Sequence, residues 1–544
     1  MEEAIQGRRR VLKAGLAGFV AAVPVWGCAT RGAGGAALIG FSPIPVSTAD
    51  AVAVPPGYRA QVLSRWGDPI GVDIGAPEFR MDASNSAAEQ ALQAGMHHDA
   101  IELFPLPSGN ALLAVNYEYT DDGLLHPDGM KTWNADKVRK SQAAHGAGIL
   151  EISLEGNGWK VVAPSRYARR VTAYTPMRMS GPAAGSRALA GEVLGTINNC
   201  GGGRTPWGTY EFDPRFDANA SPTEPNKFGW VVEIDPYDPQ AQPVKRTALG
   251  RFKHEGAMVT LAADGRVVVY MGDDERFEYV YKFVSKDAYN ASNRAANRDL
   301  LDEGTLYAAK FGAGGHGEWL ALPRSAEAAV YTRQAADKAG ATKMDRPEWI
   351  AVHPVTQDVY VTLTNNDRRG RDGQPGVDSC NPRANNVYGH ILKWREQGSD
   401  PAAAKFRWEM FALCGEDKGF GSPDGLWFDA RGVLWIQTDV STSTLGKGPY
   451  AKLGNNQMLA ADVATGEIRR FLTGPAGCEV TGVTMAPDGR TMFVNIQHPG
   501  EPASERSDPA APRAVSNWPD RRPDGRPRAA TVAIRREDGG PIGA

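Results

Sequence analysis

Residues 254–275 read HEGAMVTLAADGRVVVYMGDDE, and this stretch decides the fold class. Glu255 precedes a short apolar run, the dipeptide Asp264-Gly265 follows, and a second apolar run ends at Asp273 and Asp274. Asp-Gly supplies the positive φ angles that tight hairpin turns require, so the stretch predicts two antiparallel strands joined by a turn. The start of the first strand and the end of the second lie at one edge of a hairpin, and the acids are therefore expected to meet there.

The same arrangement recurs along the chain. The copies open on Asp99, Glu255, Glu348, Asp424 and Glu479, and they end near Glu118, Asp274, Asn366, Asp439 and His498. From acid to turn the spacing is ten residues in four copies and eight in the Asp424 copy. Residues 195–212, around Cys200, stand where a sixth copy is expected. Repeated hairpins of this kind predict an all-β fold, a six-bladed β-propeller with the acids at one mouth. For any single copy, ordinary solvated caps at strand ends are the alternative.

Composition agrees with one large β body. The chain holds 62 Gly and 38 Pro, together 100 of 544 residues, which disfavours a helical bundle or a coiled coil. We expect a single domain over residues 36–544, with long inter-blade insertions near 276–344 and 368–390. The strand predicted at residues 530–534 closes the ring by pairing with an early segment at 58–63. The net charge of −3, without a long basic run in the body, disfavours nucleic acid as a partner.

The first 35 residues are interpreted as an export signal. Three arginines, Arg8 to Arg10, precede the apolar stretch 14–26, which is too short to span a bilayer. This pattern predicts recognition by the twin-arginine translocase and a periplasmic or secreted protein. A basic amphipathic helix is the alternative, and anchoring as a lipoprotein through Cys28 is a second possible outcome of processing.

The clustered acids predict bound cations. Carboxylates at close range raise one another's pKa, and cations relieve that repulsion. Oxygen ligands suit Ca²⁺, whereas the thiolate of Cys200, in a glycine-rich turn, would attract a softer metal such as iron or zinc. A buried, inert thiol is the alternative for Cys200. His254 and His498 stand at strand edges, where they can bind a metal or support a ligand.

Several segments together resemble the PhoX-type alkaline phosphatases, and the resemblance runs from about Val54 to the C-terminus. They are GRFKHE (250–255), MGDDERFEY (271–279), DRPEWI (345–350), NPRANNVYGH (381–390), SPDGLW (422–427) and GCEVTG (477–482), together with NNC (198–200) and TPWGT (205–209).

The resemblance implies a twin-arginine-exported β-propeller phosphatase that depends on Ca²⁺ and Fe³⁺ and hydrolyses small phosphate monoesters. Arg346, Cys200 and Glu348 are implied as catalytic residues, with Arg346 contacting the substrate phosphate. The implied metal ligands are Cys200, Glu118, Glu255, Asp274, Glu348, Asp424, Asp439 and Glu479. We expect a monomer.

The sequence departs from the family pattern at two places. The adjacent acids that usually follow TPWGT are replaced by Tyr210-Glu211-Phe212-Asp213, and the usual His before Glu118 is Tyr117. If the missing acid is a metal ligand, either one cation site is lost or Glu211 or Asp213 supplies the ligand. Two other functions stay open: a calcium-dependent lactonase that uses the same acids, and a non-catalytic propeller that binds a metal or ligand.

Overall fold

A computed structural model describes residues 38–214, 225–504 and 506–544, and the expected signal segment 1–35, with Cys28, lies outside them. The described chain is mostly β, with its strands in five hydrogen-bonded sheets. Neighbouring strands run antiparallel, except that β7 and β11 are parallel. No helix in the described part of the chain combines the length and the apolar composition that a membrane crossing requires.

The strands are assigned to the sheets as follows. One sheet holds, in spatial order, β1 (Tyr58–Arg65), β27 (Ala530–Arg536), β26 (Thr491–Gln497) and β25 (Glu479–Met485). The next holds β2 (His98–Pro105), β3 (Ala111–Tyr117), β4 (Gly146–Glu155) and β5 (Gly158–Val161), with β6 (Arg169–Val171) on β4. The third holds β8 (Asn199–Arg204), β9 (Tyr210–Pro214), β10 (Val232–Ile234), β11 (Val244–Arg246) and β7 (Arg178–Ser180).

The nine-stranded sheet consists of two runs joined edge to edge. One run is β12 (His254–Leu261), β13 (Arg266–Asp273), β14 (Val280–Ala288), β15 (Gly304–Phe311) and β16 (His316–Ala321). The other is β17 (Pro347–Val352), β18 (Val359–Leu363), β19 (His390–Glu396) and β20 (Lys405–Leu413), and β16 pairs with β20. The last sheet holds β21 (Pro423–Phe428), β22 (Val433–Thr438), β23 (Gln457–Asp462) and β24 (Glu467–Thr473).

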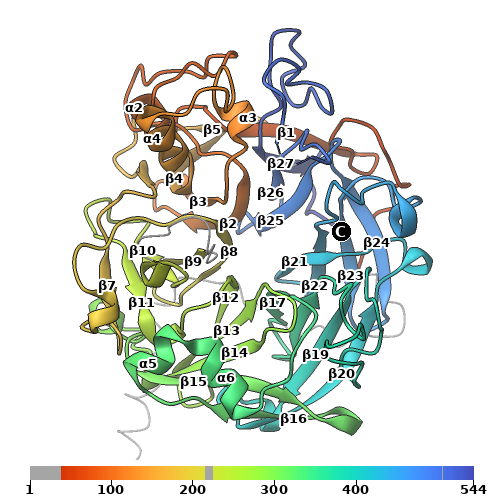
Figure 1. Cartoon of the computed structure of the whole chain (residues 1–544). Helices are drawn as coiled ribbons and strands as arrows, with labels where there is room; N and C mark the ends of the chain where they lie inside the picture. Colours follow the sequence, from red (N-terminus) through yellow and green to blue (C-terminus); the bar gives the residue numbers. More distant parts are fainter. Residues whose placement is uncertain (1–37, 215–224, 505) are drawn as a thin grey trace, which may run out of the picture.

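The sheets lie around a common centre, in the order of the chain (Figure 1). Their innermost strands are β2, β8, β12, β17, β21 and β25, and each contacts the next, with β25 returning to β2. Buried apolar side chains fill the space between neighbouring sheets; Ile391 of β19, for example, shares a cluster with Leu434 of β22. This packing holds the six inner strands in a closed ring.

The two ends of the described chain close that ring. β1 pairs antiparallel with β27, with Tyr58 opposite Arg536 and Ala60 opposite Ile534. The predicted pairing of an early segment with the strand at 530–534 is thus confirmed. The sheet of β25, β26 and β27 is thus completed by the N-terminal strand β1.

The predicted hairpins are present. They are β2–β3, β12–β13, β17–β18, β21–β22 and β25–β26, and β8–β9 is the sixth. The glycines of the turns, Gly109, Gly265, Gly432 and Gly489, all have positive φ, as the turn chemistry requires.

Longer segments stand between the hairpins. The segment 276–344 was expected to be an insertion, but it contributes β14, β15 and β16 to the nine-stranded sheet. Only the remainder of the segment is an insertion between the repeated hairpins. It also carries α5 (Ala326–Val330) and α6 (Thr332–Ala339). The segment 368–390 is irregular up to β19. The other α-helices are α2 (Ala87–Gln90), α3 (Asp122–Leu125) and α4 (Ala135–Ala144). Short 3₁₀ turns are η1 (Arg187–Leu189), η2 (Pro225–Lys227), η3 (Thr247–Leu249), η4 (Arg294–Asn297), η5 (Ala313–Gly315), η6 (Gln397–Ser399), η7 (Glu416–Lys418) and η8 (Gly448–Tyr450).

Candidate metal centre

Each inner strand breaks its regular pairing near its start. The register shifts between His98 and Ile101 in β2, between Asn199 and Gly202 in β8, and between Pro423 and Leu426 in β21, and shifts of the same kind occur in β12, β17 and β25. A β-bulge bends the strand and re-aims a side chain. In the first three strands the residues inside the shift include Asp99, Cys200 and Asp424.

A second backbone feature accompanies the bulge. In five of the six copies the residue two positions before the acid or cysteine has a positive φ: His97, Asn198, Arg346, Ser422 and Gly477. Four of these are not glycine, and non-glycine residues in this region are strained and concentrate at functional sites. The strain is thus repeated where four of the six inner strands enter the ring.

The first group, which we call the thiol cluster, consists of Asp99, Glu118 and Cys200. All three are buried, and one ligand atom from each lies within 4.8 Å of the others. The Cys200 thiol also donates a hydrogen bond of 2.8 Å to Glu255 Oε1. That contact needs a glycine next to Cys200, since a Cβ on Gly201 would lie 2.0 Å from the backbone nitrogen of Gly256.

The second group, the arginine cluster, consists of Glu255, Asp274 and Glu348, which are buried and meet the same 4.8 Å limit. Asp274 follows β13 directly, while Glu255 and Glu348 lie at the starts of β12 and β17. Arg346 joins two of the carboxylates: its Nη2 lies 2.8 Å from Asp274 Oδ1 and 2.9 Å from Glu348 Oε1. The Arg346 side chain keeps 18% of its surface exposed.

The third group, the histidine cluster, consists of Asp439, Glu479 and His498. His498 Nε2 lies 3.5 Å from Glu479 Oε2, and its Nδ1 lies 3.0 Å from the carbonyl oxygen of Gly477 and 3.6 Å from Glu501 Oε2. Although burial opposes the charged ring, Glu501 and Asp439 raise the pKa of His498. The ring is therefore held in one orientation beside the carboxylates.

Asp424 connects the clusters. It belongs to none of the three groups of potential ligands. Burial, and after it the charges of Glu479 and Glu255, raise the pKa of the Asp424 carboxyl well above its usual range. Asp424 thus lies between the histidine cluster and the arginine cluster, and the three groups adjoin one another.

The electrostatics of this centre fit bound cations. Burial, followed by the charges of neighbouring carboxylates, raises the pKa of Glu348 and of Glu479 well above the usual range of a glutamate. Oδ1 of Asp424 is buried and has no hydrogen-bond partner within the described part of the chain. A buried carboxylate oxygen without a donor is costly, and a cation would satisfy it. The donor set, mostly carboxylates with one thiol and one imidazole, is therefore suited to metal ions.

All eight predicted ligands lie in this one region. Seven of them are members of the three clusters, and Asp424 adjoins them. The predicted catalytic residues Arg346, Cys200 and Glu348 lie in or against the same clusters. The roles themselves stay predictions.

Two members of the clusters were not among the predicted ligands. Asp99 opens the first copy of the repeat, so its position within the repeat was already a signal. His498 stands at the end of the last copy, where a polar group is expected. His254, by contrast, stacks on Phe252 with ring centroids 3.6 Å apart and is not a member of the clusters.

Comparison with known families identifies the chain. The family described as "Alkaline phosphatase PhoX" matches residues 39–500. The chain belongs to the PhoX family. It is therefore an alkaline phosphatase, an enzyme that hydrolyses phosphate monoesters, as the resemblance predicted.

One solved structure agrees with membership of the PhoX family. Pseudomonas fluorescens PhoX in complex with vanadate, a transition state analogue, is 42% identical, covers 93% of this chain and 100% of its own, and has a TM-score of 0.87. A protein of unknown function from Dyadobacter fermentans has 10% identity over 88% of this chain and 99% of its own, with a TM-score of 0.42. The curated proteins compared with the chain include no match.

The departure from the PhoX pattern after Thr209 falls on Glu211 and Asp213, whose side chains lie outside the described part of the chain. Tyr117, the other departure, is fully buried and packs edge-on against His98, with ring centroids 5.0 Å apart. Cys380 and Cys414 do not form a disulfide; the Cys380 thiol lies 3.1 Å from Asp378 Oδ1.

Proposed function

We propose that the chain hydrolyses small phosphate monoesters at the thiol, arginine and histidine clusters, which form one metal centre at the mouth of a six-bladed β-propeller. The observation that carries this proposal is the convergence of Asp99, Cys200, Glu255, Glu348, Asp424 and Glu479 from six separate inner strands.

The propeller assignment rests on three features. Six inner strands contact one another in a closed ring, and each is followed by its antiparallel hairpin partner. The N-terminal strand β1 completes the sheet of β25, β26 and β27. The sheets extend outward from the ring (Figure 1). The nine-stranded sheet then corresponds to two blades whose outer strands, β16 and β20, are joined.

The donor chemistry and the PhoX resemblance together favour iron and calcium. The thiolate of the thiol cluster, with Cys200 beside Glu255, suits a softer metal such as iron or zinc, and the resemblance favours iron. The oxygen ligands of the other two clusters suit Ca²⁺. When bound, such cations supply positive charge that stabilises the phosphoryl group in the transition state.

Arg346 binds and orients the substrate. Its guanidinium group is fixed by Asp274 and Glu348, and it remains partly exposed. A planar guanidinium with several donors matches the oxygens of a phosphate group. We assign Glu348 to hold Arg346 in this orientation through the contact at Oε1. Burial of the carboxylates keeps water from screening these interactions.

The experiment combines an assay with elemental analysis. Purified protein loaded with metal should release phosphate from an aryl phosphate, and Glu348→Gln should be much slower, with Glu409→Gln, an exposed carboxylate on β20, as the matched control. Iron and calcium together support the phosphatase centre. Calcium alone, with lactone hydrolysis instead of phosphate release, would assign the lactonase, and a protein without either metal or activity would be a binding propeller.

We also propose that residues 1–35 direct export of the folded protein through the twin-arginine translocase, to the periplasm or out of the cell. Replacing Arg8 and Arg9 by Lys should retain the protein in the cytoplasm. Export that is unchanged in this variant would argue against the route, and a lipid label on the protein that is lost with Cys28→Ala would assign a lipoprotein anchor. Light scattering tests the expected monomer.

A further inference from the structure

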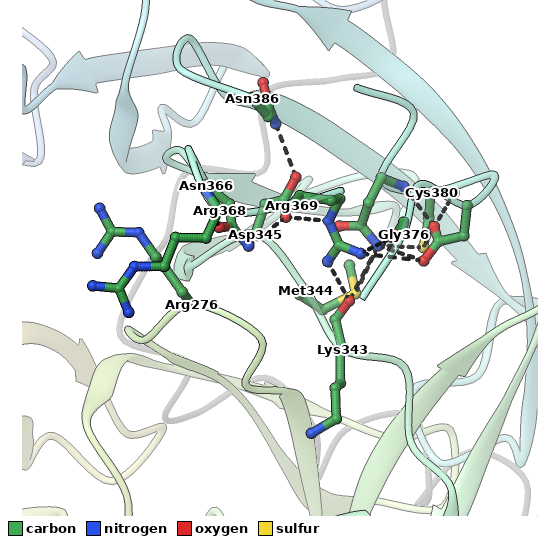
Figure 2. Close-up of polar contacts among 12 residues, drawn as sticks. Arg276, Lys343, Met344, Asp345, Asn366, Arg368, Arg369, Gly376, Cys380 and Asn386 are labelled. Atoms are coloured by element: carbon green, nitrogen blue, oxygen red, sulfur yellow. Dashed lines mark hydrogen bonds and ion pairs between the residues drawn. The ribbon is translucent and has the colours of Figure 1, made fainter. Parts of the chain in front are cut away.

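A buried polar network lies next to the arginine cluster. Asp345 is fully buried and accepts hydrogen bonds from Arg369 Nε, from Asn366 Nδ2 at 2.9 Å and from Asn386 Nδ2 at 3.0 Å (Figure 2). Arg369 is 1% exposed and also donates to the carbonyl oxygens of Lys343 and Gly376, at 2.7 and 2.8 Å. None of the three metal-site clusters includes these residues.

The network joins three chain segments beside the metal centre. Asp345 is followed by Arg346, whose carbonyl oxygen accepts a hydrogen bond of 3.0 Å from the backbone of Thr364. The loop of Asn366 and Arg369 therefore begins directly beside the residue that is proposed to bind phosphate. On the other side, Arg276 forms an isolated antiparallel bridge with Asp345, two residues after Asp274.

Two arginines project from these segments on the side away from Arg369. In Figure 2 the guanidinium groups of Arg276 and Arg368 both extend from the network in the direction opposite to Cys380. Arg276 is 31% exposed, and Arg368 is exposed. The Arg368 backbone is held by a hydrogen bond of 3.1 Å to Asn366 Oδ1, so the buried network positions it.

Arginines outnumber carboxylates in one group of contacts here. Asp367, the residue before Arg368, pairs with Arg276 Nε at 3.1 Å and with Arg371 Nη2 at 2.8 Å. One carboxylate is therefore shared by two guanidinium groups, and Arg368 adds a third positive charge next to it. Such a group of arginines is suited to a phosphate oxyanion.

We propose that Arg276 and Arg368 form a subsite for a second phosphate on the leaving group of the substrate. The inference rests on the proposed hydrolysis at Arg346 and names the substrate class of that site: compounds that carry two phosphates. Arg346 and the metal centre hold the phosphate that reacts. Arg276 and Arg368 hold the one that leaves with the alcohol.

The test compares propane-1,3-diol bisphosphate with its monophosphate. The bond that is broken is the same in both, and only the second phosphate differs. Two equivalent esters alone make kcat/KM about twofold higher for the bisphosphate. If the subsite binds the second phosphate, the wild type should prefer the bisphosphate by about tenfold or more. Arg276→Gln and Arg368→Gln should each reduce this preference by about fivefold. Raising the salt concentration should reduce it as well.

Arg395→Gln is the matched control. Arg395 also pairs with a carboxylate, Asp358, but it lies on β19 at the edge of the sheet opposite to the mouth, and its variant should keep the preference. Thermal unfolding checks that all three variants fold. A wild type that hydrolyses the monophosphate yet prefers the bisphosphate by no more than the statistical factor would overturn the subsite, as would an unchanged preference in both arginine variants. Release of phosphate from neither compound would instead contradict the proposed function.

Discussion

The buried pair of Asp345 and Arg369 allows one prediction to be worked out from its contacts. In Arg369→Met an apolar side chain replaces the guanidinium group. Asp345 keeps its two amide donors but loses its countercharge, while the carbonyl oxygens of Lys343 and Gly376 lose their donors. Removing one partner of a buried ion pair costs about 3–5 kcal/mol, because the other charge remains buried.

This free energy corresponds to a small but measurable change in Tm. The unfolding entropy is about 2.1 cal/mol/K per residue, or roughly 1 kcal/mol/K for a chain of this size, so about 4 kcal/mol lowers Tm by about 4 °C. Differential scanning calorimetry of the metal-loaded protein measures the shift. Arg368→Met, the exposed neighbour, is the control and should change the stability by no more than about 0.5 kcal/mol.

A double variant separates the charge from the packing. Asp345→Asn in the Arg369→Met background removes the uncompensated carboxylate, so the double variant should regain about half of the lost stability. Strictly additive losses in the two single variants and the double variant would refute the ion-pair reasoning, as would an Arg369→Met protein that melts with the wild type.

Three more predictions concern the centre and the rest of the fold. Glu348→Gln should lower kcat/KM for an aryl phosphate by about 10²- to 10³-fold, while Glu409→Gln stays within about twofold; equal rates would remove Glu348 from the site. Glu479→Gln should raise the Tm of chelator-treated protein, because it removes one of several buried like charges. The same variant should lower the Tm of metal-loaded protein, and a shift of the same sign in both states would argue against a cation at Glu479. Burial, and then the charge of Lys227, lowers the pKa of Lys245 from its ordinary 10.5 to about 7. Between these pH values the unfolded chain binds more protons than the folded chain. The free energy of unfolding should therefore rise from pH 7 to pH 10.5 by an amount on the order of 4 kcal/mol, and this rise should be absent in Lys245→Met. Urea unfolding of both proteins at several pH values measures the rise, and parallel curves would contradict the assignment.

Much of the fold was predictable because it is built from local signals. An acid, a β-run, a turn glycine and a second β-run identify each hairpin from consecutive residues, and Gly265 and Gly489 adopt the predicted positive φ. The pairing of the strand at 530–534 with an N-terminal segment was also predictable, since a ring of sheets needs closure. The segment 276–344 was harder, because its strands β14 to β16 lack the repeated acid and turn.

The candidate ligands were predictable for the same reason, and the exceptions are informative. The repeat singles out one edge of every hairpin, which is why Glu255, Glu348 and Glu479 could be named before any distance was known. His498 was harder to assign, since a histidine beside a strand end is common and only the nearby Glu479 makes it a candidate ligand. The network around Asp345 was not predicted, because its members are spread between residues 343 and 386 without a regular spacing.

The sequence by itself determined which residues share one edge of the hairpins, because hairpin geometry is local: two strands and a tight turn bring their outer ends together wherever they stand in the fold. Only the tertiary structure decided how those residues group. The division into thiol, arginine and histidine clusters depends on bulges, on positive φ angles before the inner strands and on close approaches such as Gly201 against Gly256. These are contacts between strands that are distant in the sequence, and their distances follow from packing of the whole ring.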